Sequence, residues 1–144
     1  MKVIIGFLLV LNLSFGFAQQ DSAENWKTLG GLEYEKGQDD YGEVFLPKFN
    51  EPIQKLEGKE IVLSGYIIPF EGMFSPDHLI ISSVPVASCF FCGGAGPESV
   101  AEIYLKETVK YTAKKVTVSG KLKLNSTDID QLMYILEDAT LEIR

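Results

Sequence analysis

Cys89 and Cys92 are the residues of this chain whose types and spacing most clearly support chemistry, and they are its only cysteines. They stand in a glycine-rich segment, 87–97, with the sequence ASCFFCGGAGP. Thiols three positions apart can close a disulfide, bind a soft metal ion or carry out thiol–disulfide exchange. The spacing alone leaves all three chemistries open.

A metal site needs more ligands than this pair. Cys-x-x-Cys is the half-site of a zinc knuckle, but structural zinc takes four protein ligands and the chain has no second cysteine pair. The remaining candidates are His78, the only histidine, and Met73, the nearest thioether. With Cys89 and Cys92 they would form a copper set or a three-ligand zinc site with one open position. The alternative for His78 is a half-exposed ring at the start of a strand.

The two other chemistries of the pair depend on its surroundings. In an oxidising compartment Cys89 and Cys92 can form a disulfide that closes the glycine-rich loop. A ring this small would stabilise the fold by much less than the ~3 kcal/mol of a fifteen-residue loop. A thiol oxidoreductase is the weaker alternative, because thioredoxin-like pairs stand beside a βαβ pattern that this sequence lacks. Phe90 and Phe91, between the thiols, would also disfavour a reactive thiolate by desolvation.

The first eighteen residues predict export. Lys2 precedes an apolar stretch at 3–17, and Gly16-Phe17-Ala18 places small residues where a signal peptidase cleaves. The stretch is short for a membrane anchor, and no cysteine follows it to carry a lipid. We therefore expect a signal peptide at 1–18, and a soluble mature protein in the periplasm or secreted, without stable membrane insertion.

The charge balance limits the partners. The chain carries 13 Lys and Arg against 20 Asp and Glu, a formal net charge of −7, and loss of Lys2 makes it more negative. Nucleic acids and anionic membranes need a concentrated positive surface, so neither is an expected partner. A metal ion or an envelope protein is compatible with this charge.

The region 58–144 predicts a β domain. Five segments combine β-branched and aromatic residues or alternate apolar with polar ones: 59–70, 78–83, 99–105, 114–124 and 134–143. Gly65 and Gly120 interrupt the first and fourth, where a small barrel would bend. The pattern predicts a mainly β protein, a five-stranded OB-like Greek-key barrel, with a β-sandwich as the alternative. Tyr66 and Tyr104 are the candidate binding residues of a barrel groove.

The preceding segment, 19–57, lacks a periodic pattern and predicts an irregular aromatic-bearing arm with a short strand at 43–46. Its Trp26 is either a ligand platform or, as we prefer, a plug over one end of the core. In the barrel region, Glu98, Glu102 and Glu107 are interpreted as solvated edge charges.

The order of several motifs resembles an exported bacterial family labelled domain of unknown function 3299. The segment GKEIVLSGYIIPFE at 58–71 is similar to the family's first strand motif, and Val84-Pro85 with Ala87-Ser88-Cys89 is similar to its cysteine stretch. The family usually has a histidine where Phe91 stands here, followed by prolines in place of Cys92 and the glycines. The resemblance implies no activity, but some members are encoded near metal-uptake transporter components, which favours metal binding by analogy.

Taken together, the sequence favours an exported accessory or binding protein over an enzyme. The first hypothesis is that Cys89 and Cys92, with His78, bind zinc or copper. The second is a structural or protein-interaction module with a Cys89–Cys92 disulfide, and the third and weaker one is a thiol oxidoreductase.

Overall fold

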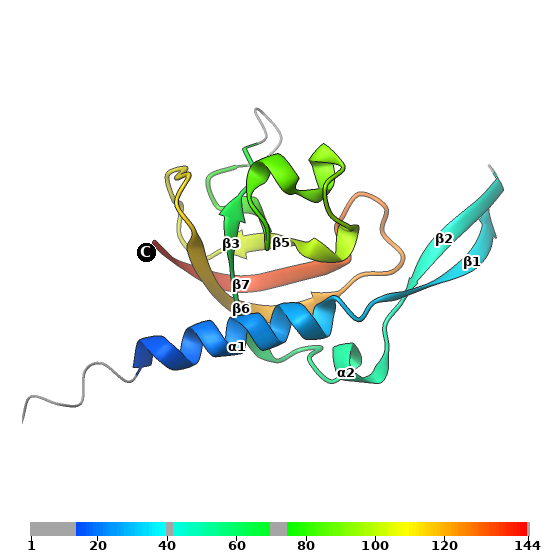
Figure 1. Ribbon diagram of the computed structural model, residues 1–144, viewed down its shortest axis with the longest axis horizontal. Helices are drawn as coiled ribbons and strands as arrows, with labels where there is room; N and C mark the ends of the chain where they lie inside the picture. The colour runs from blue at the N-terminus through cyan, green and yellow to red at the C-terminus, as the bar shows by residue number, and fades with distance from the viewer. Residues whose placement is uncertain (1–13, 40–41, 70–74, 144) are drawn as a thin grey trace, which may run out of the picture.

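The computed structural model describes residues 14–39, 42–69 and 75–143 (Figure 1). Met73, one of the candidate metal ligands, lies outside these ranges. The helices are α1 (Ser14–Leu29) and α2 (Glu51–Gln54), with short 3-10 helices η1 (Val86–Ser88), η2 (Phe90–Cys92) and η3 (Pro97–Ser99). The strands are β1 (Glu33–Asp39), β2 (Gly42–Lys48), β3 (Glu60–Ile67), β4 (His78–Ser82), β5 (Val100–Leu105), β6 (Val116–Leu124) and β7 (Tyr134–Ile143).

The last five strands close a barrel in the order β3-β4-β5-β7-β6. All neighbours are antiparallel except β5 and β7, which run parallel. This order, in which the third barrel strand pairs with the fifth, is that of the five-stranded OB-type Greek-key barrel. The predicted mainly β, OB-like barrel is confirmed, and each predicted strand overlaps an observed one.

The barrel interior follows from the period-two alternation of the strands. Alternate residues point to the same side of a strand, so one apolar set from each strand fills the centre. Leu63, Ile81, Ile103, Val118 and Leu136 are fully buried members of this core.

The two predicted bends fall at places where the pairing changes. β3 pairs with β6 up to Gly65 and with β4 from Tyr66 onward, so Gly65 marks the strand's change of partner. At Gly120 the register between β6 and β7 shifts, and Asp138 on the opposite strand adopts a φ of 51°. One extra residue on β7 therefore forms a bulge there, a common device for curving a barrel strand.

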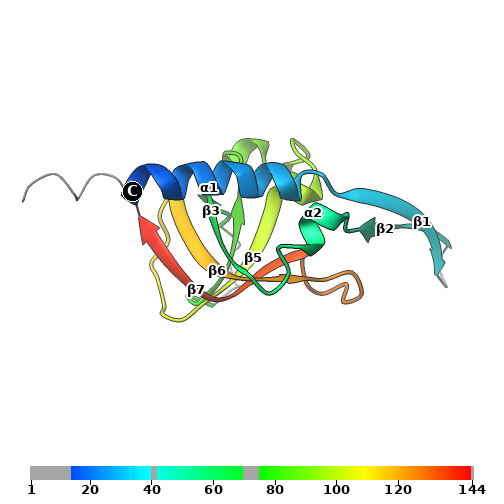
Figure 2. The same ribbon diagram turned by 90° about the horizontal axis from the view of Figure 1, so that it is seen from below.

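The arm contains more regular structure than the sequence pattern predicts. The short strand expected at 43–46 is part of β2, which pairs with β1 along its whole length. This hairpin extends away from the barrel (Figures 1 and 2). The helix α1 lies across one side of the barrel. The helix α1 escaped prediction because it docks largely by hydrogen bonds, as described below, rather than by a periodic apolar stripe.

Trp26 occupies the place of a core plug, as preferred from the sequence. Its ring packs against the barrel core, and its indole N–H donates to the carbonyl oxygen of Ser64 at 3.0 Å. Ala18, the predicted cleavage site, lies within α1, and Trp26 follows it in the chain. This contact would therefore survive cleavage. In the part of the chain that the structure describes, no helix is both long and apolar enough to span a membrane.

Candidate functional site

The two cysteines lie in the connection between β4 and β5, and we refer to residues 84–96 as the dithiol loop. Cys89 stands between η1 and η2, and Cys92 ends η2. The backbone N–H of Cys92 donates to the carbonyl oxygen of Cys89 at 3.0 Å, which makes a tight turn. Gly93 follows with a φ of 78°, and a Cβ on Gly94 would stand 2.6 Å from the carbonyl oxygen of Ser88. Glycine is therefore required at both positions by the turn itself.

The turn brings the thiols together without joining them. The Sγ atoms of Cys89 and Cys92 are 3.8 Å apart, and both residues are free cysteines. The side chain of Cys89 is 1% exposed, whereas Cys92 is exposed and its thiol donates to the carbonyl oxygen of Val86 at 3.2 Å. A reagent or ligand from solvent would reach the sulfur of Cys92 first.

Cys89 belongs to a small apolar cluster outside the barrel core. Its buried neighbours are Ile68, Ile80 and Val100, and Leu132 packs against them from the connection between β6 and β7. We call this set the satellite cluster. It lies on the outer face of β4 and β5, because the alternate residues of these strands, such as Ile81, face the barrel interior. The dithiol loop is thus anchored by Cys89.

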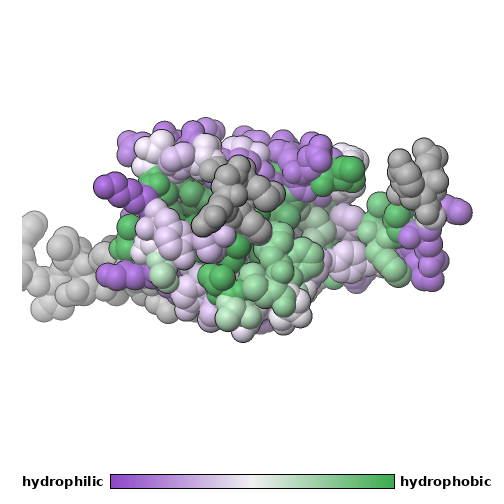
Figure 3. Space-filling view, turned by 90° about the horizontal axis from the view of Figure 1, so that it is seen from above, coloured by the Kyte–Doolittle hydropathy of each residue, from purple (hydrophilic) through white to green (hydrophobic). Residues whose placement is uncertain are grey.

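Hydrophobic side chains also reach the surface of this region. Phe90 and Phe91, between the cysteines, are 36% and 42% exposed, with ring centroids 5.2 Å apart in an edge-on arrangement. Figure 3, which looks onto the side of the barrel that carries the dithiol loop, shows hydrophobic surface among polar residues. The two phenylalanines lie between the buried Cys89 and the exposed Cys92 in the sequence.

A buried carboxylate lies next along the same outer face. Glu102 is 4% exposed, and its Oε1 lies 2.6 Å from Nε2 of His78 and accepts a hydrogen bond from the hydroxyl of Tyr104 at 2.8 Å. The backbone N–H of Leu132 donates to its Oε2 at 2.9 Å, and the Gln131 amide donates to the Tyr104 hydroxyl at 3.2 Å. We call these five residues the carboxylate network.

The network corrects one interpretation of the sequence. Glu102 was expected to be a solvated edge charge, and that expectation is wrong. Strand alternation does place its side chain on the outside of the barrel, but the segment that carries Gln131 and Leu132 covers it. Such a cover comes from residues about thirty positions away, so it leaves no local signal around Glu102.

Within the described part of the chain, His78 is not grouped with the two cysteines. Across residues 14–39, 42–69 and 75–143, no three His, Cys, Asp or Glu side chains are grouped closely enough to hold a metal ion. His78 is engaged by Glu102 and stacks on Tyr104, with centroids 4.2 Å apart and an interplanar angle of 14°. Cys89 and Cys92 therefore remain as the chain's two adjacent soft donors.

The two candidate tyrosines lie on the same outer face of the barrel but in different cross-strand pairs. Tyr66 is half-buried and lies opposite Ser82, whereas Tyr104 lies opposite His78. The cross-strand pair of Ile80 and Glu102 lies between these positions on β4 and β5. Tyr104 therefore acts within the carboxylate network, and Tyr66 stands apart from it.

The pairing of the thiols raises the pKa of Cys92, so less of its thiol is ionised at a given pH. Its thiol pKa is raised, chiefly by the hydrogen bond with Cys89 and further by desolvation and by the charge of a Cys89 thiolate. A raised pKa leaves less thiolate at a given pH, so the rise of its alkylation rate with pH should be displaced to higher pH. Iodoacetamide alkylation, followed residue by residue by mass spectrometry from pH 6 to 11, measures this.

The matched variant is Cys89→Ala, in which the midpoint for Cys92 should fall toward the ~8.5 of an unperturbed cysteine. A peptide spanning residues 90–96 provides the unperturbed reference. Equal midpoints for Cys92 in the two proteins would contradict the assigned coupling.

Comparisons with protein-family models, with curated proteins and with solved structures find no match to this chain. The likeness to an exported bacterial family described above therefore remains a prediction. What the geometry defines is a class of architecture, an OB-like barrel with a dithiol loop on its outer face.

Proposed function

We propose that this chain is an exported accessory protein that binds a transition-metal ion through Cys89 and Cys92. The observation that supports it is the separation of the two sulfurs, 3.8 Å. Zinc–thiolate bonds of about 2.3 Å at a tetrahedral angle place two sulfurs about 3.8 Å apart. The pair thus already has the spacing of two tetrahedral zinc ligands, and little reorganisation is needed on binding.

Cys89 and Cys92 would supply two ligands, and the remaining positions of such a site would be filled by other groups. Tetrahedral zinc has four positions, and water, a second copy or a partner can supply the other two. Because Cys92 is exposed, an ion bound to it would be accessible from solvent. Such access suits a protein that receives or passes on a metal. Copper(I), which also favours thiolates, is the second candidate ion.

A structural or protein-interaction module with a Cys89–Cys92 disulfide is the competing function. The hydrogen-bonded turn holds the two Cα atoms within the reach of a disulfide, and an exported protein would meet oxidising conditions. Thiol oxidoreductase activity has less support, because a raised pKa at the exposed Cys92 disfavours the attacking thiolate.

Metal and thiol content of the mature protein, isolated from the periplasm without chelator, tests the proposal. We expect about one zinc or copper ion per chain or per two chains, with both thiols unreactive toward Ellman's reagent until a chelator is added. Cys92→Ser should lose the metal, whereas Ser88→Ala, in the same loop, should keep it.

Other outcomes would point elsewhere. Metal-free protein without titratable thiols would refute metal binding and establish the disulfide form. Metal-free protein whose thiols exchange rapidly with glutathione disulfide would also refute it, in favour of the oxidoreductase.

A further inference from the structure

The cysteine pair supplies only half of the ligands that a tetrahedral ion takes. Its two sulfurs lie 3.8 Å apart, and in the described part of the chain no third His, Cys, Asp or Glu side chain is grouped with them. Zinc and copper(I) prefer thiolate ligands to water. Because Cys92 is exposed, an ion on the pair stands at the surface of the chain. Its two remaining positions are therefore open to another chain.

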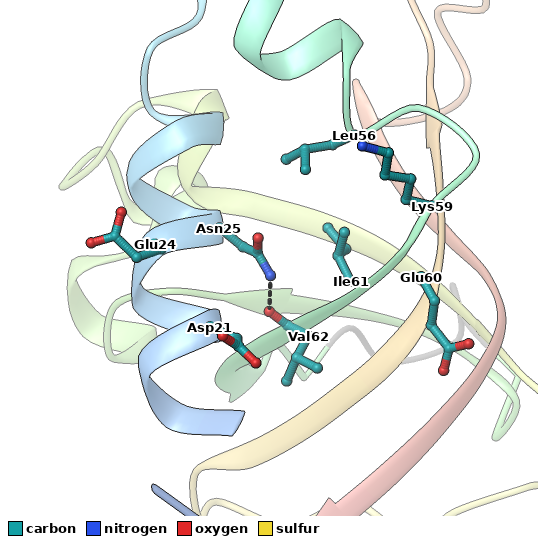
Figure 4. A pocket seen from close by; sticks show the side chains of 8 residues that line it. All are labelled: Asp21, Glu24, Asn25, Leu56, Lys59, Glu60, Ile61 and Val62. Atoms are coloured by element: carbon teal, nitrogen blue, oxygen red, sulfur yellow. Dashed lines mark hydrogen bonds between the residues drawn. The ribbon is translucent and has the colours of Figure 1, made fainter. Parts of the chain in front are cut away.

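The dithiol loop belongs to a part of the sequence that carries no charge. From Leu79 to Pro97 there is no Asp, Glu, Lys or Arg, although these residues make up 23% of the chain. No other run of this length without them follows the predicted signal peptide. The groove between α1 and β3 is different, because four of the eight residues that line it are charged: Asp21, Glu24, Lys59 and Glu60 (Figure 4).

A neutral loop on an acidic chain favours a second copy over a basic partner. Two chains that each carry a net charge of −7 repel each other when they approach through their acidic surfaces. This repulsion is smallest where neither chain presents a charge, as at the dithiol loop. A basic partner would gain most from the acidic surfaces and nothing from this loop.

A second copy also brings the missing ligands. In a two-fold interface the same surface of each chain meets its equivalent, so Cys92 of one copy would lie opposite Cys92 of the other. Two pairs supply four thiolates, which is the ligand set of a closed zinc site. Phe90 and Phe91, which are 36% and 42% exposed, would be withdrawn from water in the same contact.

We propose that two copies of this chain meet at their dithiol loops and hold one zinc ion between them with four thiolates, two from each copy. This inference rests on the proposed function, since it names the partner that completes the same site. A stable interface usually takes about 20–30 residues on each side, more than residues 84–96 provide. Association therefore depends on the ion, and the protein without zinc is a monomer.

A zinc titration of the mature protein, with both thiols reduced, tests the proposal. Zinc chloride is added in steps, and native mass spectrometry gives the number of chains and of zinc ions in each particle. We expect conversion from monomer to dimer that is complete at one zinc ion per two chains, and return to monomer when EDTA is added. Cys92→Ser should neither bind zinc nor form the dimer.

Two matched charge insertions localise the contact. Ala87 is an exposed residue of the dithiol loop, and Ala113 is an exposed residue of the connection between β5 and β6. Ala87→Glu brings two like charges together and should weaken the zinc-bound dimer about tenfold. Ala113→Glu adds the same charge elsewhere and should leave the dissociation constant within about twofold. Unchanged thermal melting confirms that both variants are folded.

The possible failures are distinguishable. A monomer that holds one zinc ion per chain would overturn the shared site, while metal binding by the cysteine pair would still stand. Protein that takes up no zinc would overturn both the shared site and the proposed function. A dimer that forms equally well without zinc, or equal effects of Ala87→Glu and Ala113→Glu, would overturn the dithiol loops as the place where the two copies meet.

Discussion

Replacement of Gly65 by alanine is expected to lower the free energy of unfolding by about 3 kcal/mol. A Cβ at this position would stand 2.3 Å from the carbonyl oxygen of Ser82 and 3.0 Å from its carbonyl carbon. Both atoms belong to the backbone of β4, so no side-chain rotation can relieve the contact. The barrel would have to open β3 from β4 at the point where their pairing begins.

Urea unfolding followed by circular dichroism measures this effect. The matched control is Gly30→Ala at the end of α1, where a Cβ would stand 3.3 Å from its nearest neighbour, the Trp26 carbonyl oxygen. The loss there should be well under half of that at Gly65. Equal losses in the two variants would show that the close approach of β3 to β4 is not what requires glycine.

Replacement of Glu102 by alanine is expected to cost a similar amount, about 3 kcal/mol. The substitution leaves the N–H of Leu132 and the hydroxyl of Tyr104 without their acceptor and removes the partner of His78. Because Glu102 is buried and its partners are half-buried, the lost bonds are only partly replaced by solvent. Glu102→Gln, which keeps an acceptor oxygen and nearly the same volume, should cost less.

The loss of Glu102 should also change the reactivity of Cys89 in the dithiol loop. Leu132 is bonded to Glu102 through its N–H and packs against the satellite cluster that buries Cys89. Alkylation of Cys89 by iodoacetamide should therefore be faster in Glu102→Ala than in the native protein. Glu107→Ala removes an exposed carboxylate and should leave stability within about 0.5 kcal/mol and Cys89 protected.

A Glu102→Ala protein with native stability would mean that the network contributes nothing net. A destabilised protein with unchanged alkylation of Cys89 would separate the carboxylate network from the satellite cluster.

The strands were predictable because their signals are local, and the barrel was inferred from their number and from the bends at Gly65 and Gly120. Val116, Val118, Leu122 and Leu124 alternate with polar residues, and this period of two is a property of the strand itself. The helix α1 was missed because Ser22 and Asn25 dock on the backbone of β3, about forty residues away. Side-chain-to-backbone bonds of this kind leave no apolar periodicity in the sequence.

The candidate site also combines features that follow from the sequence with features that follow only from the tertiary structure. The sequence by itself determined that Cys89 and Cys92 are near neighbours, since three residues of chain and a glycine-rich turn keep them together. Only the tertiary structure decided that Cys89 is buried, that Cys92 is exposed and that His78 is engaged by a buried Glu102. Burial and hydrogen bonding depend on which distant segments cover a residue, and that is set by the closure of the barrel rather than by neighbours in the chain.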